Sequence, residues 1–438
     1  MNRTVSFQTL GCKLNQYETD SLATDFQKAG WEIVPFGKEA LVQIINTCTV
    51  TNKADRKSRN TVHKAEKTAR GALVIVTGCF AQSARDELEG RDGITYVVDN
   101  QNKSQIFNLV EAHYRGEDPS GTIPVGTIKS TPSQALFDYS VADKIYHTRA
   151  TVKVQDGCDN FCTYCIIPFV RGPAVSRPLE QVVENIKALV DKGFKEIILT
   201  GINITTYDDQ GKNFEDLLER ILEVEGDWRL RVSSVEPENL GPRFFKLLNH
   251  PRLCPQIHLC LQSGSPKVLS EMKRNYTLET FTNLAQALRK ENPDFNITTD
   301  LIAGFPGETL EDHQASLKAL EQFTFGHVHI FPYSRRKGTK ADLAENQISE
   351  DEKTKRTLEL EALMVQEKLR YRKFLLGKTQ TVLVERVTGN RGYGMGENYV
   401  PVEFTLDGVQ WNQFYPVQLL SLGEGEEPLF EGLPCAGA

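Results

Sequence analysis

Short apolar runs alternate with longer amphipathic stretches through residues 1–115. TVSFQTL, LVQIINT and ALVIVTG have the apolar, β-branched character of strands. Between them lie LNQYETDSLATDFQKAG and a basic segment, both patterned as helices. Strand–helix alternation predicts a parallel sheet with right-handed crossovers, and hence an α/β domain over residues 1–115.

A second series of strand-like runs follows a stretch rich in Pro, Gly, Ser and Thr, which is typical of a linker and covers residues 116–144. The runs are TVKVQD, KEIILTG, RLRVSSV, QIHLCLQS, FNITTDLIAG and GHVHIFPYS, with helical segments between them. Six such units predict a partial barrel of parallel strands over residues 145–370, short of the eight that close a complete barrel.

The last part of the chain changes its pattern again. Ser349 and Glu352 form a capping-box sequence ahead of a long amphipathic helix. Beyond Gly377 come short β runs broken by Gly and Asn, which predict a small antiparallel β-barrel over residues 371–438. The fold class expected for the whole chain is α/β with this small barrel appended.

Composition places the chain among globular proteins. Its 438 residues exceed one ordinary domain, and its 39% hydrophobic content is typical of soluble proteins. No apolar run approaches the ~20 residues of a membrane span, and the N-terminus lacks the pattern of a signal peptide. We therefore expect a cytoplasmic protein without a membrane partner.

The net charge of −7 argues, by itself, against a nucleic-acid partner. The charge is unevenly spread, however, because residues 52–70 and 366–392 each carry seven Lys and Arg, whereas 403–438 carry none. A basic stretch is more often a solvated helix face than a binding site, but two of them keep a nucleic-acid partner open.

Three cysteines each follow a predicted strand of the first domain: Cys12, Cys48 and Cys79. The carboxyl ends of parallel strands share one edge of the sheet, where ligands gather, so these thiols can meet despite their separation in sequence. The alternative is three buried structural thiols, since Cys is commonly buried. We call these residues the N-terminal cysteine set.

A second group, Cys158, Cys162 and Cys165, follows the first strand of the predicted partial barrel with C-x-x-x-C-x-x-C spacing. Three is an odd number for disulfides, and tetrahedral zinc normally takes four protein ligands, or three and a water. Three thiolates suit a cubane iron–sulfur cluster with one iron left open for another ligand. We call these residues the barrel cysteine set. Cys254, Cys260 and Cys435 lack such spacing and are predicted not to be ligands.

Together these motifs resemble the radical SAM methylthiotransferases over nearly the whole chain. TGCFAQ, DGCDNFCTYCIIPFVRG, LQSGS, ITTDLIAGFPGET and FPYSRRKGT all recur in that family. TLGCKLN and NTCTVTNKADRKSR are most similar to its MtaB type, which modifies N6-threonylcarbamoyladenosine beside the tRNA anticodon. The family's usual G-T-P-A is here Gly338-Thr339-Lys340-Ala341.

The resemblance implies two [4Fe–4S] clusters, one on each cysteine set, S-adenosyl-L-methionine as cofactor, and a C-terminal TRAM domain. It implies methylthiolation of C2 in the modified adenosine of a tRNA anticodon stem-loop, with an electron donor and a sulfur donor of unknown identity. The residues that it suggests for S-adenosylmethionine are Tyr164, Thr200, Gly201, Asn203, Ser234, Glu236, Gln262, Ser263 and Gly304.

Substrate contacts are a further prediction. Threonylcarbamoyladenosine ends in a carboxylate, so a site for it should supply a cation. Arg171 follows the loop of the barrel cysteine set, and Arg336 and Lys337 follow the sixth strand, so all three are predicted to reach the barrel mouth. Contact with tRNA phosphate is the alternative role for Arg336. Two other functions stay open: RimO-type methylthiolation of a ribosomal protein aspartate, and a non-catalytic iron–sulfur protein that binds RNA.

Overall fold

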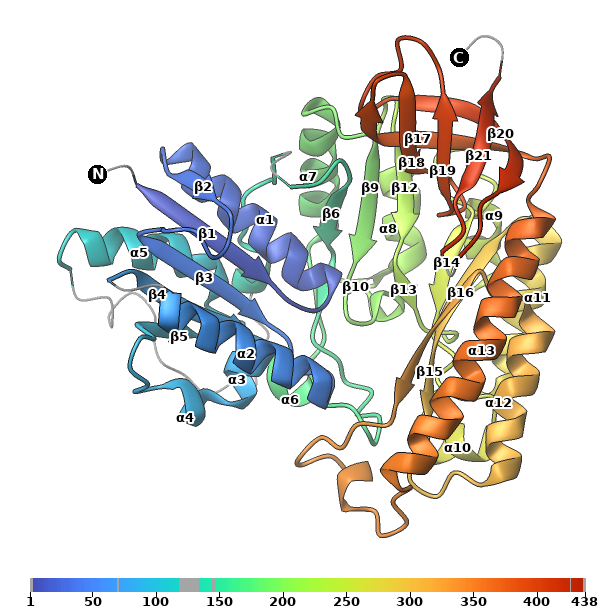
Figure 1. Ribbon diagram of the computed structural model, residues 1–438, viewed down its shortest axis with the longest axis horizontal. Helices are drawn as coiled ribbons and strands as arrows, with labels where there is room; N and C mark the ends of the chain where they lie inside the picture. Colours follow the sequence, from blue (N-terminus) through green and yellow to red (C-terminus); the bar gives the residue numbers. More distant parts are fainter. Residues whose placement is uncertain (1–2, 69–70, 118–133, 144–145, 426, 436–438) are drawn as a thin grey trace.

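The N-terminal domain is a five-stranded parallel sheet in the order β2-β1-β3-β4-β5. The computed structural model describes residues 3–68, 71–117, 134–143, 146–425 and 427–435 (Figure 1). The elements of this domain are β1 Thr4–Thr9, α1 Lys13–Lys28, β2 Glu32–Val34, β3 Val42–Thr47, α2 Asn52–Thr68, β4 Leu73–Gly78, α3 Cys79–Ser83, α4 Arg85–Leu88, β5 Tyr96–Val98, η1 Lys103–Gln105 and α5 Ile106–Tyr114.

Successive side chains of a strand point to opposite faces of this sheet, and each face forms its own hydrophobic core. Ile44 and Ile75 pack with α1 and α5 on one face. Ile45 and Val76 pack with α2, α3 and α4 on the other face. Both faces of β3 and β4 are therefore covered, which explains why these strands are apolar throughout.

Six parallel strand units form the central partial barrel, as predicted. The strands are β6 Ala150–Lys153, β9 Glu196–Thr200, β12 Arg229–Val232 continuing into β13 Ser234–Val235, β14 Gln256–Leu259, β15 Asn296–Ala303 and β16 His327–Pro332. The helices are α6 Ile167–Arg171, α7 Leu179–Asp191, α8 Phe214–Leu222, α9 Pro242–Leu247, α10 Pro266–Glu271, α11 Leu278–Glu291, α12 Leu310–Phe323 and α13 Glu350–Phe374. Four two-residue strands form two pairs: β7 Gln155–Asp156 with β8 Val175–Ser176, and β10 Asp208–Asp209 with β11 Lys212–Asn213. Short 3₁₀ helices are η3 Gln134–Phe137, η4 Ile204–Thr206 and η5 Ala341–Leu343.

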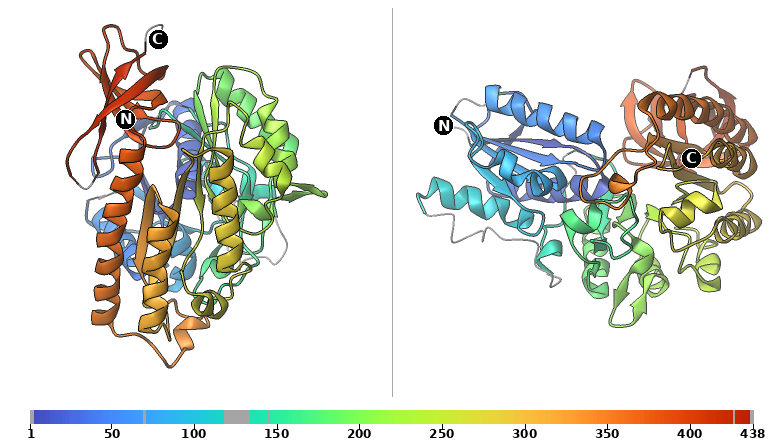
Figure 2. Two further views of the ribbon diagram at one scale, coloured as in Figure 1. Left: turned by 90° about the vertical axis from the view of Figure 1, so that its right-hand side faces the viewer. Right: turned by 90° about the horizontal axis from the view of Figure 1, so that it is seen from below.

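The partial barrel does not close on itself, because β6 and β16 are the edges of its two sheets. The N-terminal domain lies beside the β6 edge, and two views show helices covering the outer side of the strands (Figures 1 and 2). Residues 118–133 and 144 of the predicted linker lie outside the described residues. At its described end, Leu136 and Phe137 are buried rather than exposed.

The C-terminal domain is a closed barrel of five strands, β17 Thr379–Thr388, β18 Arg391–Met395, β19 Pro401–Thr405, β20 Phe414–Leu422 and β21 Phe430–Pro434. Its pairs are antiparallel except β19 with β21. This one parallel pair follows from the strand number, because an odd number of strands cannot close a barrel with antiparallel pairs alone. Helix α13 runs past the predicted boundary at 370/371, and Tyr371 packs into the core of this barrel.

Two arginines attach this barrel to the partial barrel. Arg229 donates to the carbonyl oxygens of Thr381 (2.6 Å) and Met395 (2.9 Å), and Arg231 donates to that of Glu397 (3.0 Å). Both guanidiniums also pair with Glu196, at 2.6 and 2.8 Å. Since β9 and β12 begin at Glu196 and Arg229, the C-terminal barrel caps the amino-terminal ends of these strands.

Candidate active site

The N-terminal cysteine set lies where three neighbouring parallel strands end. Cys12 follows β1, Cys48 follows β3, and Cys79 begins α3 after β4. A glycine precedes two of them for steric reasons. Gly11 has φ +96°, and a Cβ there would lie 2.8 Å from Cys48 Sγ; a Cβ on Gly78 would lie 2.3 Å from a carbonyl oxygen. Close approach of these strand ends therefore depends on the absence of a side chain.

Polar side chains fix the backbone around this set. Asn15 Nδ2 donates to the carbonyl oxygens of Leu10 (2.8 Å) and Thr47 (3.0 Å), which joins the ends of β1 and β3. Ser58 Oγ donates to the carbonyl oxygen of Cys48 at 2.8 Å. The strand ends are thus held in place by residues of α1 and α2.

The barrel cysteine set occupies the loop between β7 and α6. Cys165 N donates to the carbonyl oxygen of Cys162 at 3.0 Å, so the loop turns back on itself. Arg274 donates to Cys162 Sγ at 3.1 Å and pairs with Glu236. The guanidinium is almost fully buried; burial raises the pKa of Cys162, and the charge of Arg274 opposes this larger effect.

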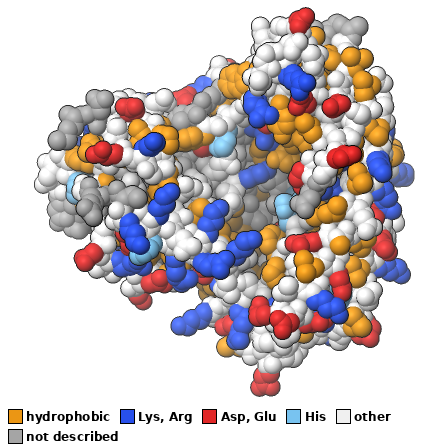
Figure 3. Space-filling view, viewed as in Figure 1, with side chains coloured by type: hydrophobic (Ala, Val, Ile, Leu, Met, Phe, Trp, Pro, Cys, Tyr) orange, Lys and Arg blue, Asp and Glu red, His pale blue; other side chains and the backbone are white. Residues whose placement is uncertain are grey.

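Both cysteine sets open into one cavity of about 1260 Å³. Of the residues suggested for S-adenosylmethionine, those that line it are Tyr164, Thr200, Gly201, Asn203, Ser234, Glu236 and Gln262. Seen from outside, this region is a hollow between the N-terminal domain and the two barrels (Figure 3). The cavity is larger than a typical site for one small molecule, so it has room for more than one reactant.

Two of the suggested residues lie away from the cavity lining. Ser263 is buried, and its hydroxyl lies 3.5 Å from that of Ser316. Gly304 N donates to Glu308 Oε1 at 3.0 Å, and a Cβ at Gly304 would lie 2.5 Å from the Lys353 side chain. These contacts give both residues a packing role at the ends of their strands.

The arginines suggested for the substrate already have partners. Arg171 lines the cavity but pairs with Asp156 at 3.0 Å and Glu18 at 3.4 Å. Arg336 pairs with Asp55 at 2.9 Å and donates to the carbonyl oxygen of Thr49 at 2.7 Å, so it links the barrel to the N-terminal domain. Lys337 is exposed and is not part of the cavity lining.

The protonation of the thiols depends on burial. Burial raises the pKa of Cys48 and of Cys158 to about 11, and that of Cys165 to about 12. These groups are therefore thiols at neutral pH in the metal-free chain. Metal ligation requires thiolates, so binding of a cluster at either set releases protons.

The donor sets fit iron–sulfur clusters. Each consists of three cysteines at a cavity wall, with an arginine beside it, Arg274 at the barrel set and Arg171 at the N-terminal set. Arg171 Nε is buried without a hydrogen-bond partner among the described residues, so it can donate to a thiolate or a bound sulfide. Asn203 Nδ2, on the cavity lining, is likewise buried and unsatisfied within the described part of the chain.

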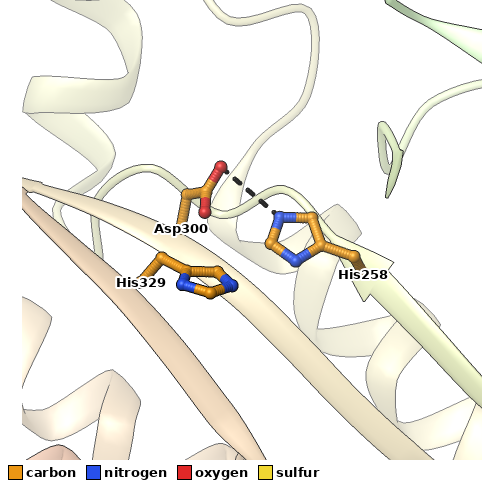
Figure 4. Close-up of side chains that lie close together, drawn as sticks. All are labelled: His258, Asp300 and His329. Carbon is orange, nitrogen blue, oxygen red and sulfur yellow. Dashed lines mark ion pairs between the residues drawn. The ribbon is translucent and has the colours of Figure 1, made fainter. Parts of the chain in front are cut away.

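A group of side chains from three adjacent strands escaped the sequence analysis. His258 on β14, Asp300 on β15 and His329 on β16 line the same cavity, and His258 Nε2 lies 3.4 Å from Asp300 Oδ2 (Figure 4). One atom from each lies within 4.8 Å of the others. Tetrahedral zinc brings ligand atoms to roughly 3.4 Å from one another. His258 Nδ1 also bonds Thr298 Oγ1 at 3.1 Å, so hydrogen bonds of this group join the neighbouring strands β14 and β15.

Comparison with known proteins agrees with this geometry. Residues 152–320 match the radical SAM superfamily, and residues 4–99 match the uncharacterized protein family UPF0004. The threonylcarbamoyladenosine tRNA methylthiotransferase MtaB of Thermotoga maritima is 37% identical, over 96% of this chain and 95% of the relative. The chain belongs to the radical SAM methylthiotransferases. The protein of the same name from Bacillus subtilis is 35% identical, over 96% of this chain and 94% of the relative.

A solved structure shows the same fold. The radical S-adenosylmethionine methyltransferase TsrM of Kitasatospora setae matches with a TM-score of 0.60 and 18% identity, over 78% of this chain and 77% of that chain. The predicted fold class and the similarity to the MtaB type are thus confirmed. This methylthiotransferase is an enzyme, which excludes the non-catalytic alternative, and the RimO-type alternative is not favoured.

Family membership also fixes part of the cofactor prediction. A radical SAM domain implies S-adenosylmethionine and one [4Fe–4S] cluster, which the barrel cysteine set fits. Among the described helices of this methylthiotransferase, none has the length and apolarity to cross a membrane.

Proposed function

We propose that the protein adds a methylthio group to C2 of N6-threonylcarbamoyladenosine beside the anticodon of tRNA. The names of the full-length relatives support this substrate. The observation that carries the reaction is the shared cavity, because methylthiolation needs a radical source and a sulfur source within reach of one carbon atom, and the two cysteine sets line the same space.

The cofactors proposed are a [4Fe–4S] cluster on each cysteine set and S-adenosylmethionine. When bound, these groups supply a reducing electron, a radical able to act on an unactivated C–H bond, and a place for the incoming sulfur. No side chain of ordinary pKa could deprotonate that carbon, which is why the chain needs such cofactors.

Side chains of the protein would bind and orient these cofactors. Asn203 Nδ2 would donate to S-adenosylmethionine, because it is otherwise buried without an acceptor among the described residues. Gln155 Oε1 accepts from the backbone of both Ile202 and Asn203 at 2.9 Å, which holds this strand end open toward the cavity. Burial raises the pKa of both Cys162 and Glu236, and Arg274 opposes this effect, so its charge would help to balance the thiolates that hold the barrel cluster.

The contribution of Arg171 differs from the one suggested by its sequence position. Its pairs with Asp156 and Glu18 hold the guanidinium beside the N-terminal cysteine set. There it would balance the negative charge of thiolates and bound sulfide rather than meet the substrate. Glu18 and Asp156 in turn set its orientation, as outer-shell partners do at metal sites.

Nucleoside analysis tests the substrate. In a deletion strain, mass spectrometry of tRNA should find threonylcarbamoyladenosine without its 2-methylthio group, while other methylthio nucleosides persist. The reconstituted protein, given S-adenosylmethionine, a reductant and sulfide, should restore the group on a stem-loop that carries threonylcarbamoyladenosine. Unchanged methylthio content of the deletion strain would contradict the proposal.

A further inference from the structure

The cations that line the cavity differ in whether they have a counter-ion. The Lys and Arg residues of the lining are Lys13, Arg171, Arg274 and Arg372. Each arginine forms ion pairs: Arg171 with Asp156 and Glu18, Arg274 with Glu236, and Arg372 with Glu427. Lys13 is the exception, since its ammonium makes no ion pair within the described part of the chain.

The carboxylates of the same cavity are also occupied. Glu236 and Glu427 hold the arginines named above, and Asp300 lies against His258. Glu196, a carboxylate whose charge acts on Lys13, is engaged by Arg229 at 2.6 Å and Arg231 at 2.8 Å. No described carboxylate is therefore left for Lys13.

Lys13 is well placed to meet a ligand. It is the first residue of α1, directly after Cys12, and its Nζ lies 5.8 Å from the ring centroid of Tyr399 in the C-terminal barrel. Arg149 and Arg231 also lie over that ring, at 5.2 and 4.7 Å. Arg149 pairs with Glu385 at 2.7 Å and Arg231 pairs with Glu196 at 2.8 Å, so Lys13 is the cation here that has no described carboxylate and is left to attract an anion entering beside Tyr399.

We propose that Lys13 binds the carboxylate of the threonylcarbamoyl group and so selects the modified adenosine. The proposal rests on the function proposed above. A half-buried ammonium without a partner is unfavourable, whereas the same ammonium paired with a bound carboxylate is not. Because Lys13 follows Cys12, a base held in this way would lie beside the N-terminal cysteine set.

The experiment measures how tightly two forms of the protein bind the acid and the ester of the modified nucleoside. The probes are anticodon stem-loops carrying threonylcarbamoyladenosine, its methyl ester, or plain adenosine. The proteins are reconstituted wild type and Lys13→Met. Wild type should bind the acid about 30-fold or more tightly than the ester, as expected when one member of a buried charged pair is lost. Lys13→Met should bind acid and ester alike and should bind plain adenosine as wild type does.

Two further variants serve as controls. Lys13→Arg keeps a cation and should retain part of the preference for the acid. Lys187→Met changes an exposed lysine of α7, away from the cavity, and should alter no affinity. Iron content and affinity for S-adenosylmethionine are measured for each protein, since Lys13 neighbours a cluster ligand. The acid–ester comparison in wild type requires no substitution, so a variant that lost iron would still leave the proposal open to refutation.

Several results would overturn it. Equal losses on all three stem-loops would identify Lys13 as a phosphate contact. A wild-type preference for the acid that persists in Lys13→Met would place the carboxylate elsewhere, and weaker binding of S-adenosylmethionine alone would assign Lys13 to that cofactor. Failure of the proposed function is distinguishable, because wild type would then form no methylthio product from the acid stem-loop.

Discussion

Glu18 of α1 is the residue whose loss should most weaken the joint between the N-terminal domain and the partial barrel. Its carboxylate contacts Lys103 Nζ at 2.5 Å, Lys153 Nζ at 3.0 Å and Arg171 Nη1 at 3.4 Å. Lys153 and Arg171 belong to the central segment, so this ion cluster crosses the domain boundary. The side chains of Glu18, Lys103 and Lys153 are all 0% exposed.

The substitution Glu18→Gln preserves shape and removes one charge. The cluster has three cations and two carboxylates, and Asp156 alone would remain to balance Lys153 and Arg171. Lys103 would lose its charged partner and keep neutral acceptors, among them Asn46 Oδ1 at 3.1 Å. Removing one member of a buried ion pair costs about 3–5 kcal/mol. For a domain of ordinary size this lowers the melting temperature by roughly 6–20 °C.

The effect should depend on pH in a defined direction. Burial alone would raise the pKa of Glu18, but Lys103, Lys153 and Arg171 outweigh it and hold the pKa well below the ordinary value. A depressed folded-state pKa means that the stabilisation is complete above the unfolded value of about 4.3 and is lost as the pH falls toward the folded one. The gap between wild type and Glu18→Gln should therefore be full at neutral pH and narrow in acid.

Calorimetry of the metal-free proteins at pH 7 and in acid would measure this. Glu39→Gln, at an exposed glutamate of the same domain, is the matched control and should leave the melting temperature unchanged. A shift below about 2 °C for Glu18→Gln at pH 7, or a gap that grew in acid, would refute the reasoning.

Three other outcomes are expected. Iron after reconstitution should be about eight atoms per chain in wild type and about four in a variant whose barrel cysteine set is changed to Ala. A variant whose N-terminal cysteine set is changed to Ala should still cleave S-adenosylmethionine but should form no methylthio product. Arg274→Met, which removes the partner of Cys162 and Glu236, should lower metal affinity or cleavage of S-adenosylmethionine by about 10–100-fold, measured by iron retention and 5′-deoxyadenosine release. Lys53 and Lys57 are exposed on α2, where basic side chains gather beside the hollow (Figure 3). Neutral substitutions of these lysines should weaken binding of modified and plain stem-loops alike, and should reduce the slope of log affinity against log salt concentration by roughly 0.7–0.9 for each phosphate that is no longer neutralised. Unequal losses of affinity for the two stem-loops would contradict a phosphate role.

The strands and the cysteine sets could be predicted because each depends on a local pattern. An apolar run followed by Cys, directly after Gly in two of the three cases, marks a strand end, and the three strand ends of the N-terminal sheet then meet at one edge because the strands are parallel. The edge strands β2 and β5 escaped because three residues are too few to show a period of two. The longer strands and helices could therefore be predicted from the sequence, whereas the three-residue strands beside them could not.

The roles of the charged residues could not be predicted in the same way. Arg171 looks free in the sequence, yet its partners lie 15 and 153 residues before it. Arg336 finds Asp55 across 281 residues. The choice of partner depends on how the domains dock, which no local pattern records. The same is true of His258, which meets Asp300 only because β14 and β15 are neighbours.

The C-terminal barrel contains part of the basic stretch 366–392, which keeps RNA binding open for it, and it also forms part of the cavity. Tyr393, Met395 and Tyr399 line the space that the cysteine sets share. Deleting residues 371–438 would remove this wall and leave Arg229 and Arg231 without the carbonyl oxygens that they bind. Such a truncation would therefore disturb the cavity itself. If the truncated protein lost RNA binding, the result would not show whether the barrel binds RNA directly or only completes the cavity. Substitutions that leave the fold intact can separate them, because a cavity residue should affect the modified base alone, whereas a surface cation should affect every stem-loop.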